Sequence, residues 1–165
     1  MWSHENIQRL ILDLYGKVSR TSFSGDAAKY QLTTAHWKDD LGLDSIELME
    51  LAAQVNSFFQ LFAAPDPPYL LSFERMEEWV EQIFAFKQRH NEVVFFHTSG
   101  TSGQSKTIGH PFSFLEREIN FLAKHFQHVS LIIPLVPSYS IYGFLFTVML
   151  PEKLNANLQY PSEPD

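Results

Sequence analysis

The run Asp40-Leu41-Gly42-Leu43-Asp44-Ser45-Ile46-Glu47-Leu48 places a serine directly after a glycine-containing turn and at the start of a helical pattern. After Ser45 the apolar residues recur at helical spacing and predict one buried stripe: Leu48, Ala52, Val55, Phe59 and Phe62. The first amides of a helix have no intrahelical partner, and the helix dipole is positive there. We therefore expect this position to favour a phosphate ester on the Ser45 hydroxyl.

The longer pattern Leu-Gly-x-Asp-Ser-Ile-Glu, with a further acid at Glu50, resembles the Asp-Ser-Leu motif of acyl and peptidyl carrier proteins. In that family the serine carries 4′-phosphopantetheine, whose thiol holds the cargo. The resemblance implies that Ser45 is the attachment site and that Gly42 and Asp44 shape the turn before it. The alternative interpretation of Ser45 is an ordinary cap, because serine is a preferred N-cap residue.

Several acidic residues lie around Ser45, namely Asp39, Asp40, Asp44, Glu47 and Glu50. They suit either a solvated helix start or a face that steers basic partner enzymes by charge. The carrier resemblance implies partner docking by four residues: Ile46, Glu47, Met49 and Glu50. The implied partners are a phosphopantetheinyl transferase and acyl-activating or acyl-transferring enzymes. Carriers of fatty-acid synthesis often continue the acidic patch where this chain has Asn56 and Ser57.

The flanking patterns predict an α-helical carrier-protein bundle of three to four helices over residues 1–88. A first helical stripe consists of Ile7, Leu10, Ile11, Leu14 and Val18. The polar stretch from Ser19 to Asp40 is typical of a loop. A helix from Phe73 to Lys87 would bury Phe73, Met76, Val80, Ile83 and Phe84. Three prolines among residues 65–68 disfavour the short third helix that carriers usually have.

A second pattern begins with the apolar run Val93–Phe96, which predicts a buried strand. It leads into the Gly-rich stretch 97–106, which lacks the Gly-Lys-Ser/Thr of a Walker A loop. The stretch resembles the Thr-Ser-Gly-Thr-Thr-Gly-x-Pro-Lys loop of adenylate-forming enzymes, with Ser105 in place of the proline and Thr107 in place of the following glycine. The resemblance implies that ATP phosphates are handled by Thr98, Ser99, Gly100, Thr101, Ser102, Gly103 and Lys106. A flexible Ser/Gly linker is the alternative interpretation.

The residues after this loop keep the order of elements of the same family. Ser113 and Glu116 predict a capping box for a helix with the stripe Leu115, Ile119, Leu122 and Phe126. A second strand follows over Val129–Pro134. The stretch Pro137–Phe144 resembles a family turn that helps form the acyl pocket, with Ser140 where the family has histidine. We therefore expect a small, incomplete α/β segment over residues 89–165.

The segment lacks the later Tyr-Gly-x-Thr-Glu-like motif, the ribose-binding aspartate and the lysine-bearing C-terminal domain of a complete synthetase. We therefore expect no synthetase activity from this chain alone, and weak or absent binding of ATP with magnesium. The main hypothesis is a carrier that holds an acyl or aminoacyl thioester on Ser45. The alternative is the N-terminal piece of a carrier–synthetase fusion that adenylates a carboxylic acid and loads it onto Ser45. A third hypothesis is self-association, or docking to a partner ligase, through residues 92–151.

Composition excludes several other classes. The net charge of −7 argues against nonspecific nucleic-acid binding. The chain has no cysteine, so any thiol chemistry must come from a prosthetic group. Early charged residues exclude a signal peptide, and the uncharged stretch 129–150 is broken by prolines, serines and a glycine, which favours buried elements over a membrane span. The scattered histidines show no metal-binding pattern. These features predict a cytoplasmic protein.

Overall fold

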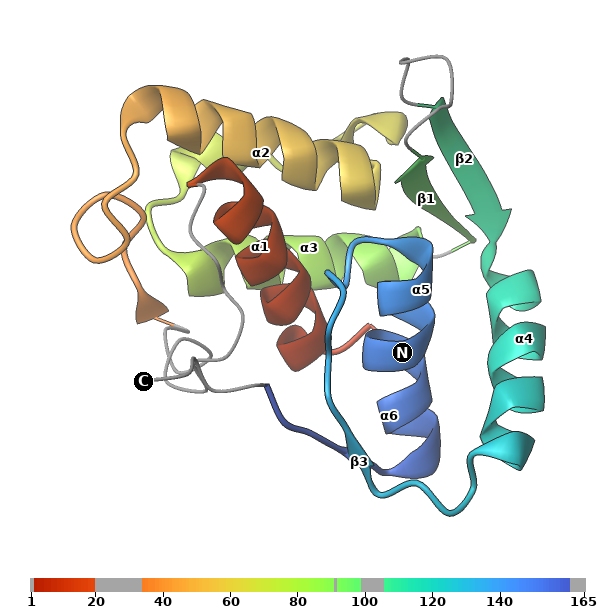
Figure 1. The fold of residues 1–165 in the computed structure, drawn as a ribbon. Helices are drawn as coiled ribbons and strands as arrows, with labels where there is room; N and C mark the ends of the chain where they lie inside the picture. The colour runs from red at the N-terminus through yellow and green to blue at the C-terminus, as the bar shows by residue number, and fades with distance from the viewer. Residues whose placement is uncertain (1, 20–33, 91, 99–105, 161–165) are drawn as a thin grey trace, which may run out of the picture.

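The computed structural model describes residues 2–19, 34–90, 92–98 and 106–160 (Figure 1). Its first half is a helical bundle of α1 (His4–Val18), α2 (Ser45–Phe59) and α3 (Met76–Arg89), with the 3-10 turns η2 (Leu61–Ala63) and η3 (Leu70–Ser72) between α2 and α3. A hairpin of β1 (Val93–Thr98) and β2 (Lys106–Pro111) leads into α4 (Phe112–His125). The last elements are β3 (Leu131–Ile132), α5 (Ile141–Gly143), η4 (Phe144–Met149), α6 (Leu150–Leu154) and β4 (Asn157–Leu158).

Helix α1 begins at a serine cap and carries the predicted apolar stripe. The Ser3 hydroxyl accepts a hydrogen bond from the Asn6 amide at 3.1 Å. All five predicted stripe residues are buried, which confirms the prediction for this helix. The polar side chains of Asn6, Gln8 and Arg9 are buried as well. Helix α1 is therefore covered on more sides than one amphipathic stripe requires.

Two predicted helix boundaries differ from those observed. Helix α2 ends at Gln60, whose φ of 54° is left-handed, and Phe62 follows in η2 with 65% of its surface exposed. Phe62 therefore leaves the buried stripe because the chain turns before reaching it. Helix α3 begins at Met76 rather than Phe73, because the Glu78 carboxylate accepts hydrogen bonds from the Glu74 and Arg75 amides and fixes the helix start there.

The prolines between α2 and α3 have the predicted effect. Residues 64–69 hold no helix, and the only helical turns nearby are the three-residue elements η2 and η3. Proline lacks an amide hydrogen and restricts the preceding residue, so this stretch cannot extend a helix.

The second half differs in detail from its sequence-based expectation. The strand expected over Val129–Pro134 is regular only at β3. The capping box expected from Ser113 and Glu116 does not form, because α4 already begins at Phe112 and Ser113 lies inside its first turn. The polar stretch near the end of the chain contributes β4, which pairs parallel to β3 with Leu131 opposite Asn157. Elements β3 to β4 thus form a strand–helix–strand crossover unit.

A continuous helical rod of α5, η4 and α6 lies between α1 and α4 (Figure 1). Ser140 caps its start by accepting a hydrogen bond from the Gly143 amide at 3.0 Å. A Cβ atom on Gly143 would lie 1.9 Å from the Pro137 carbonyl oxygen, so only glycine permits this close turn. The predicted turn Pro137–Phe144 is therefore the start of the rod.

One apolar core joins the two halves. An aromatic cluster combines Trp2, Phe58 and Phe59 from the first half with Phe96 of β1 and Phe144 of η4. Phe144 lies 5.7 Å from Trp2 and 5.5 Å from Phe96 between ring centroids. The division into a unit of residues 1–88 and a unit of residues 89–165 stays a prediction. Among the described residues, no helix is both long enough and apolar enough to cross a bilayer.

Candidate functional site

Ser45 lies where the sequence predicts it, at the first position of α2. Gly42 adopts a φ of 70°, a left-handed conformation that glycine takes without strain, and lets the chain turn sharply before the helix. Asp44 is the N-cap residue, and Ser45 is exposed to solvent. The hydroxyl of Ser45 is therefore accessible to a modifying enzyme.

The expectation of unpaired amides beside Ser45 is wrong. The Asp44 carboxylate accepts hydrogen bonds from the Ile46 and Glu47 amides, both at 2.8 Å. The Glu47 carboxylate in turn accepts from the Asp44 amide at 3.0 Å and completes a capping box. A phosphate ester on Ser45 would have to compete with the Asp44 carboxylate for these donors.

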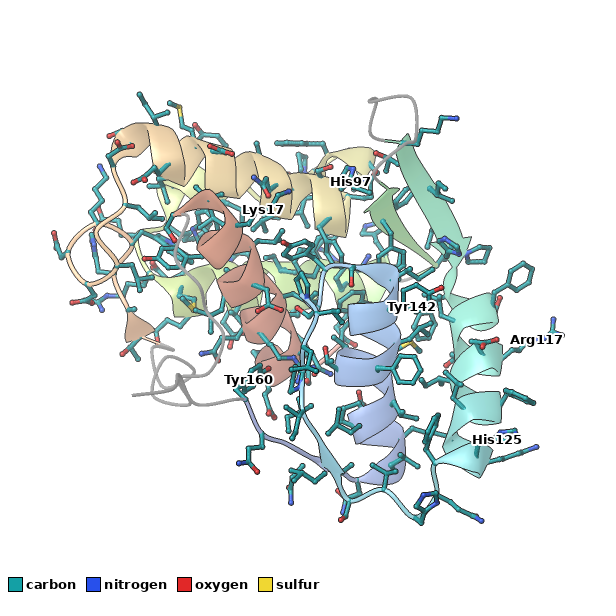
Figure 2. All side chains as sticks on the ribbon, viewed as in Figure 1. Lys17, His97, Arg117, His125, Tyr142 and Tyr160 are labelled. Carbon is teal, nitrogen blue, oxygen red and sulfur yellow. The ribbon has the colours of Figure 1, made fainter. Side chains whose placement is uncertain are left out.

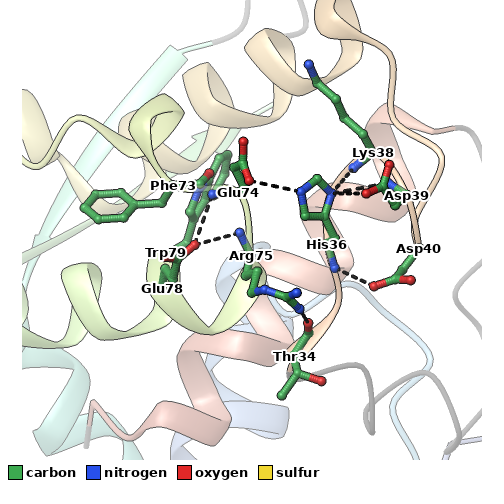
Figure 3. Close-up of polar contacts among 10 residues, drawn as sticks. All are labelled: Thr34, His36, Lys38, Asp39, Asp40, Phe73, Glu74, Arg75, Glu78 and Trp79. Carbon is green, nitrogen blue, oxygen red and sulfur yellow. Dashed lines mark hydrogen bonds and ion pairs between the residues drawn. The ribbon is translucent and has the colours of Figure 1, made fainter.

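A polar network around His36 fixes the chain before this turn to the start of α3 (Figure 3). His36 Nδ1 accepts from the Lys38 and Asp39 amides at 3.3 Å each, which leaves Nε2 to donate to Glu74 at 3.4 Å. Arg75 donates to the Thr34 carbonyl at 2.7 Å across an isolated antiparallel bridge. Beneath this network the rings of Trp37 and Trp79 lie 4.5 Å apart in the core.

Of the four predicted docking residues, three are exposed and one, Glu47, is half-buried. Ile46 and Met49 are 71% and 53% exposed, so α2 presents two apolar side chains to solvent. Glu50 is exposed and accepts a hydrogen bond from Gln54. Glu47 is half-buried and holds the capping box, so its carboxylate serves the helix start first.

The Gly-rich stretch connects the two strands of the β1–β2 hairpin. Thr98 ends β1 and Lys106 begins β2, and the two residues are direct partners in the antiparallel register. The exposed Lys106 therefore lies at the base of the connection, beside the end of β1. The predicted phosphate-loop residues Ser99, Gly100, Thr101, Ser102 and Gly103 lie outside the described residues.

His97 links the base of this hairpin to the end of α2 (Figure 2). Its Nε2 atom lies 3.1 Å from the Ser57 hydroxyl, and its Nδ1 atom lies 3.0 Å from the Thr107 hydroxyl. No sequence motif predicted these contacts of His97. The described residues contain no group of three or more acidic or histidine side chains arranged to hold a metal ion.

Helix α2 separates the Ser45 turn from the base of the β1–β2 hairpin. Ser45 begins the helix, and Ser57 near its other end contacts His97 of the hairpin. At 1.5 Å of rise per residue, the two serines are about 18 Å apart along the axis. Among the described residues, the Ser45 turn and the base of the β1–β2 hairpin therefore lie at opposite ends of α2.

The sequence did not predict that two basic residues, Lys87 and Arg9, are buried. Lys87 is 3% exposed, and its ammonium lies 5.2 Å from the Trp2 ring centroid, while burial lowers the pKa of Lys87 to about 8. The spacing of Met76, Val80 and Ile83 on the α3 stripe continues at Lys87, so the periodicity contained this signal. The long side chain packs its stem against the core.

The second buried base, Arg9, is 4% exposed and donates to Asn6 at 2.9 Å. Arg9 lines a cleft of about 860 Å³ between α1 and the end of the chain. One turn further along α1, the Asp13 carboxylate accepts a hydrogen bond from the Ser138 amide at 2.7 Å. Burial raises the pKa of Asp13, while the hydrogen bonds from Ser138 and the charge of Arg9 oppose that rise. No sequence pattern predicts that Arg9 is buried or that Asp13 is half-buried.

Comparison with known proteins shows similarity to ligases. No protein family model matches the chain, and no solved structure matches it. The chain is 31% identical over 131 residues to a protein named 4-coumarate–CoA ligase from Rhodobacter capsulatus, covering 74% of this chain and 34% of the relative. Proteins of the same name from Cereibacter sphaeroides and Halorhodospira halophila are 31% and 30% identical, each over 70% of this chain. The chain spans about a third of the length of these relatives.

The extent of this similarity bears on both halves of the chain. A match over 74% of 165 residues cannot fit within residues 89–165, so it includes part of the helical bundle. The relatives support an adenylate-forming ligase-like segment, as the Gly-rich loop suggested. None of the three is named a carrier protein, and the carrier interpretation of residues 1–88 stays a prediction.

Proposed function

We propose that this chain is part of an ATP-dependent acid ligase and supplies its phosphate-binding hairpin. The observation that carries the proposal is the backbone pairing of Thr98 with Lys106, which puts an exposed lysine at the base of a Gly-rich connection. Lysine charge and backbone amides are suitable donors for a polyphosphate. The similarity to proteins named 4-coumarate–CoA ligase supports the same assignment.

The proposed reaction joins a carboxylic acid to a thiol in two steps. In the first step a carboxylate oxygen of the acid attacks the α-phosphorus of ATP, and pyrophosphate leaves. In the second step a thiolate attacks the carbonyl carbon of the acyl adenylate, and AMP leaves. Lys106 would stabilise the negative charge of the phosphates in the first step. The hydrogen bonds that His97 makes with the Ser57 and Thr107 hydroxyls support the base of this hairpin against α2.

The 165-residue chain contains only part of such a site, so we expect weak binding of nucleotide. We expect a dissociation constant of about 1 mM for MgATP, which corresponds to a binding free energy of about −4 kcal/mol. Titration of the 15N-labelled chain with MgATP, followed by two-dimensional NMR, should shift the amide signals of Thr98, Lys106 and Thr107. Lys106→Ala should weaken these shifts, while Lys124→Ala, which removes an exposed lysine of α4, should not. Absence of shifts at the hairpin, or equal shifts in Lys106→Ala, would contradict the proposal.

A second candidate function, that of a carrier, is favoured by the position of Ser45. An exposed serine at the first residue of a capped helix, after a left-handed glycine, is where the carrier resemblance expects 4′-phosphopantetheine. In this version the thiol that accepts the acyl group is attached to the chain itself. The phosphopantetheine on Ser45 and the phosphate hairpin would then stand at opposite ends of α2.

Mass spectrometry of the intact protein distinguishes the two candidates. The chain is incubated with coenzyme A and a broad-specificity phosphopantetheinyl transferase. A carrier gains the mass of one phosphopantetheine group, and Ser45→Ala abolishes the gain while Ser113→Ala, an exposed serine of α4, retains it. An unmodified wild-type chain would contradict the carrier function and would not affect the ligase proposal.

A further inference from the structure

Near the end of α3, the Lys87 side chain carries a buried positive charge. Only 3% of its surface is exposed, and its ammonium lies 5.2 Å from the Trp2 ring centroid. Among the described residues, no carboxylate forms an ion pair with Lys87, and no acceptor takes a hydrogen bond from its ammonium. Buried charges in proteins are generally paired, because a charge removed from water without a partner is costly. Lys87 therefore lacks the anion that would compensate its burial.

Lys87 also lines a cleft of about 270 Å³, where the ends of α2 and α3 meet β1. The cleft has aromatic walls, since each of these three elements contributes a phenylalanine: Phe59, Phe86 and Phe95. The Phe95 ring lies against the bare backbone of Gly109, where a Cβ atom would approach its Cε1 atom to 2.8 Å. Sites for drug-sized ligands enclose roughly 300–1,000 Å³, so this smaller cleft suits a molecule built on one ring.

The charged side chains around the cleft favour an anion. Besides Lys87, the cleft is lined by Arg89 and His90, and Glu92 is the one carboxylate among its described lining residues. With the imidazole neutral, two positive charges stand against one negative charge. The cleft is thus locally positive in a chain whose net charge is −7.

The cleft is separate from both candidate sites. Val93 at the start of β1 lines the cleft, whereas Thr98 at the end of β1 pairs with Lys106. At about 3.3 Å per residue, the two ends of β1 are about 17 Å apart. Ser45 and Phe59 are the first and last residues of α2, and they lie about 21 Å apart along its axis. A ligand in the cleft would therefore occupy neither the base of the hairpin nor the Ser45 turn.

We propose that this cleft binds a small aromatic anion, with its charged group beside the Lys87 ammonium and its ring among Phe59, Phe86 and Phe95. The anion supplies the missing partner of Lys87, and the ring gains apolar burial against three aromatic side chains. A hydrated ion such as inorganic phosphate gains only the first of these contributions. The proposal does not depend on the ligase function, because it involves neither a nucleotide nor the hairpin.

The test is a titration of the full 165-residue chain, labelled with 15N, with benzoate in the absence of nucleotide. We expect saturable shifts of the amide signals of Phe86–His90 and Val93–Phe95, while those of Ser45 and Thr107 stay unchanged. Benzamide has nearly the same shape but no charge. It should therefore bind at least about tenfold more weakly than benzoate.

A matched pair of variants tests the role of Lys87. Lys87→Met keeps an unbranched side chain and removes the charge, and it should fold because it replaces an unpaired buried ammonium by an apolar group. This variant should bind benzoate and benzamide about equally. Lys124→Met changes an exposed lysine of α4 outside the cleft and should keep the preference for benzoate.

Four results would overturn the proposal. The first is an absence of shifts at the cleft when benzoate is in large excess. The second is a set of shifts centred on Thr98 and Thr107, which would place the anion at the phosphate hairpin. The third is a preference for benzoate that survives Lys87→Met. The fourth is displacement of benzoate by an equal concentration of inorganic phosphate, because the cleft would then recognise charge alone.

Discussion

Helix α1 of the α1–α3 bundle and helix α4 of the region from β1 to β4 differ in how completely their apolar side chains are covered. Helix α1 is buried on several sides, including the side that carries Asn6 and Arg9. By contrast, Phe114 and Phe121 of α4 are 60% and 58% exposed, and Leu135 after β3 is 81% exposed. The later elements thus help to cover α1, whereas α4 and the residues after β3 expose apolar side chains to solvent.

The contact between the regions should dominate stability. Phe144 of η4 is fully buried against Trp2, Phe58 and Phe96. Phe144→Ala should lower the free energy of unfolding by about 3–5 kcal/mol through lost burial and a cavity. Urea unfolding followed by tryptophan fluorescence and by circular dichroism measures the loss. Coincident transitions would indicate one cooperative unit, whereas a bundle that unfolds separately from the β1–β4 region would break the comparison. Phe121→Ala, at an exposed site, serves as the control.

The buried ammonium of Lys87 should cost stability at neutral pH. Because burial lowers its pKa from 10.5 to about 8, the unfolded chain binds more protons between these values, and stability rises with pH across that window. Lys87→Met should therefore stabilise the protein by up to about 3 kcal/mol at and below pH 8. The gain should shrink toward zero near pH 10.5. The midpoints of urea unfolding of wild type and Lys87→Met, measured from pH 8 to pH 10.5, test this prediction. A difference in stability that does not change with pH would exclude the titration of Lys87 as its cause.

The polar contact between the regions should have a smaller effect than the aromatic one. Asp13→Ala removes the acceptor for the buried Ser138 amide and should cost about 1–3 kcal/mol. Asp13→Asn keeps an oxygen acceptor and should lose less, because burial opposes the charge on Asp13. Thermal unfolding of both variants checks the order. Equal losses would indicate that the charge of Asp13, and not only its acceptor oxygen, stabilises the contact.

The smallest expected effect concerns the cap of α2 within the bundle. Asp44→Ala removes two hydrogen bonds to helix amides and should cost about 1 kcal/mol. Asp44→Ser keeps a capping oxygen and should recover most of the loss. Denaturant titration of the two variants tests this. A loss of unfolding free energy as large as that of Phe144→Ala would show that Asp44 stabilises more of the structure than the start of α2.

The parts of the fold that follow local patterns could be predicted from the sequence. The stripe of α1, the start of α2 at Ser45 and the strand from Val93 depend on spacing and turn residues within a short window. The predicted helix boundaries were less accurate, because α2 ends at the left-handed Gln60 and α3 begins where the Glu78 carboxylate accepts a hydrogen bond from the Arg75 amide.

The contacts between distant residues could not be predicted in this way. The buried Arg9 and the half-buried Asp13 lie on one side of α1, where Asp13 contacts the distant Ser138, and no local pattern encodes such a pairing. The two-residue strand β4 forms only because β3 lies beside it. At the candidate sites, the exposed Ser45 and the Thr98–Lys106 pairing follow from the motifs, whereas the His97 contacts with Ser57 and Thr107 depend on how α2 packs on β1.

The burial of α1 by later residues has a consequence for synthesis of the nascent chain. Helix α1 leaves the ribosome before the other helices and strands described above, but its contacts with Ser138 and Glu152 join residues 125 and 146 positions apart. At typical translation rates the helix waits about 6–30 s before these partners emerge. Until then, the side of α1 that carries Asn6, Arg9 and Asp13 lacks these two partners. Helix α1 is therefore synthesised well before the residues that complete its final surroundings.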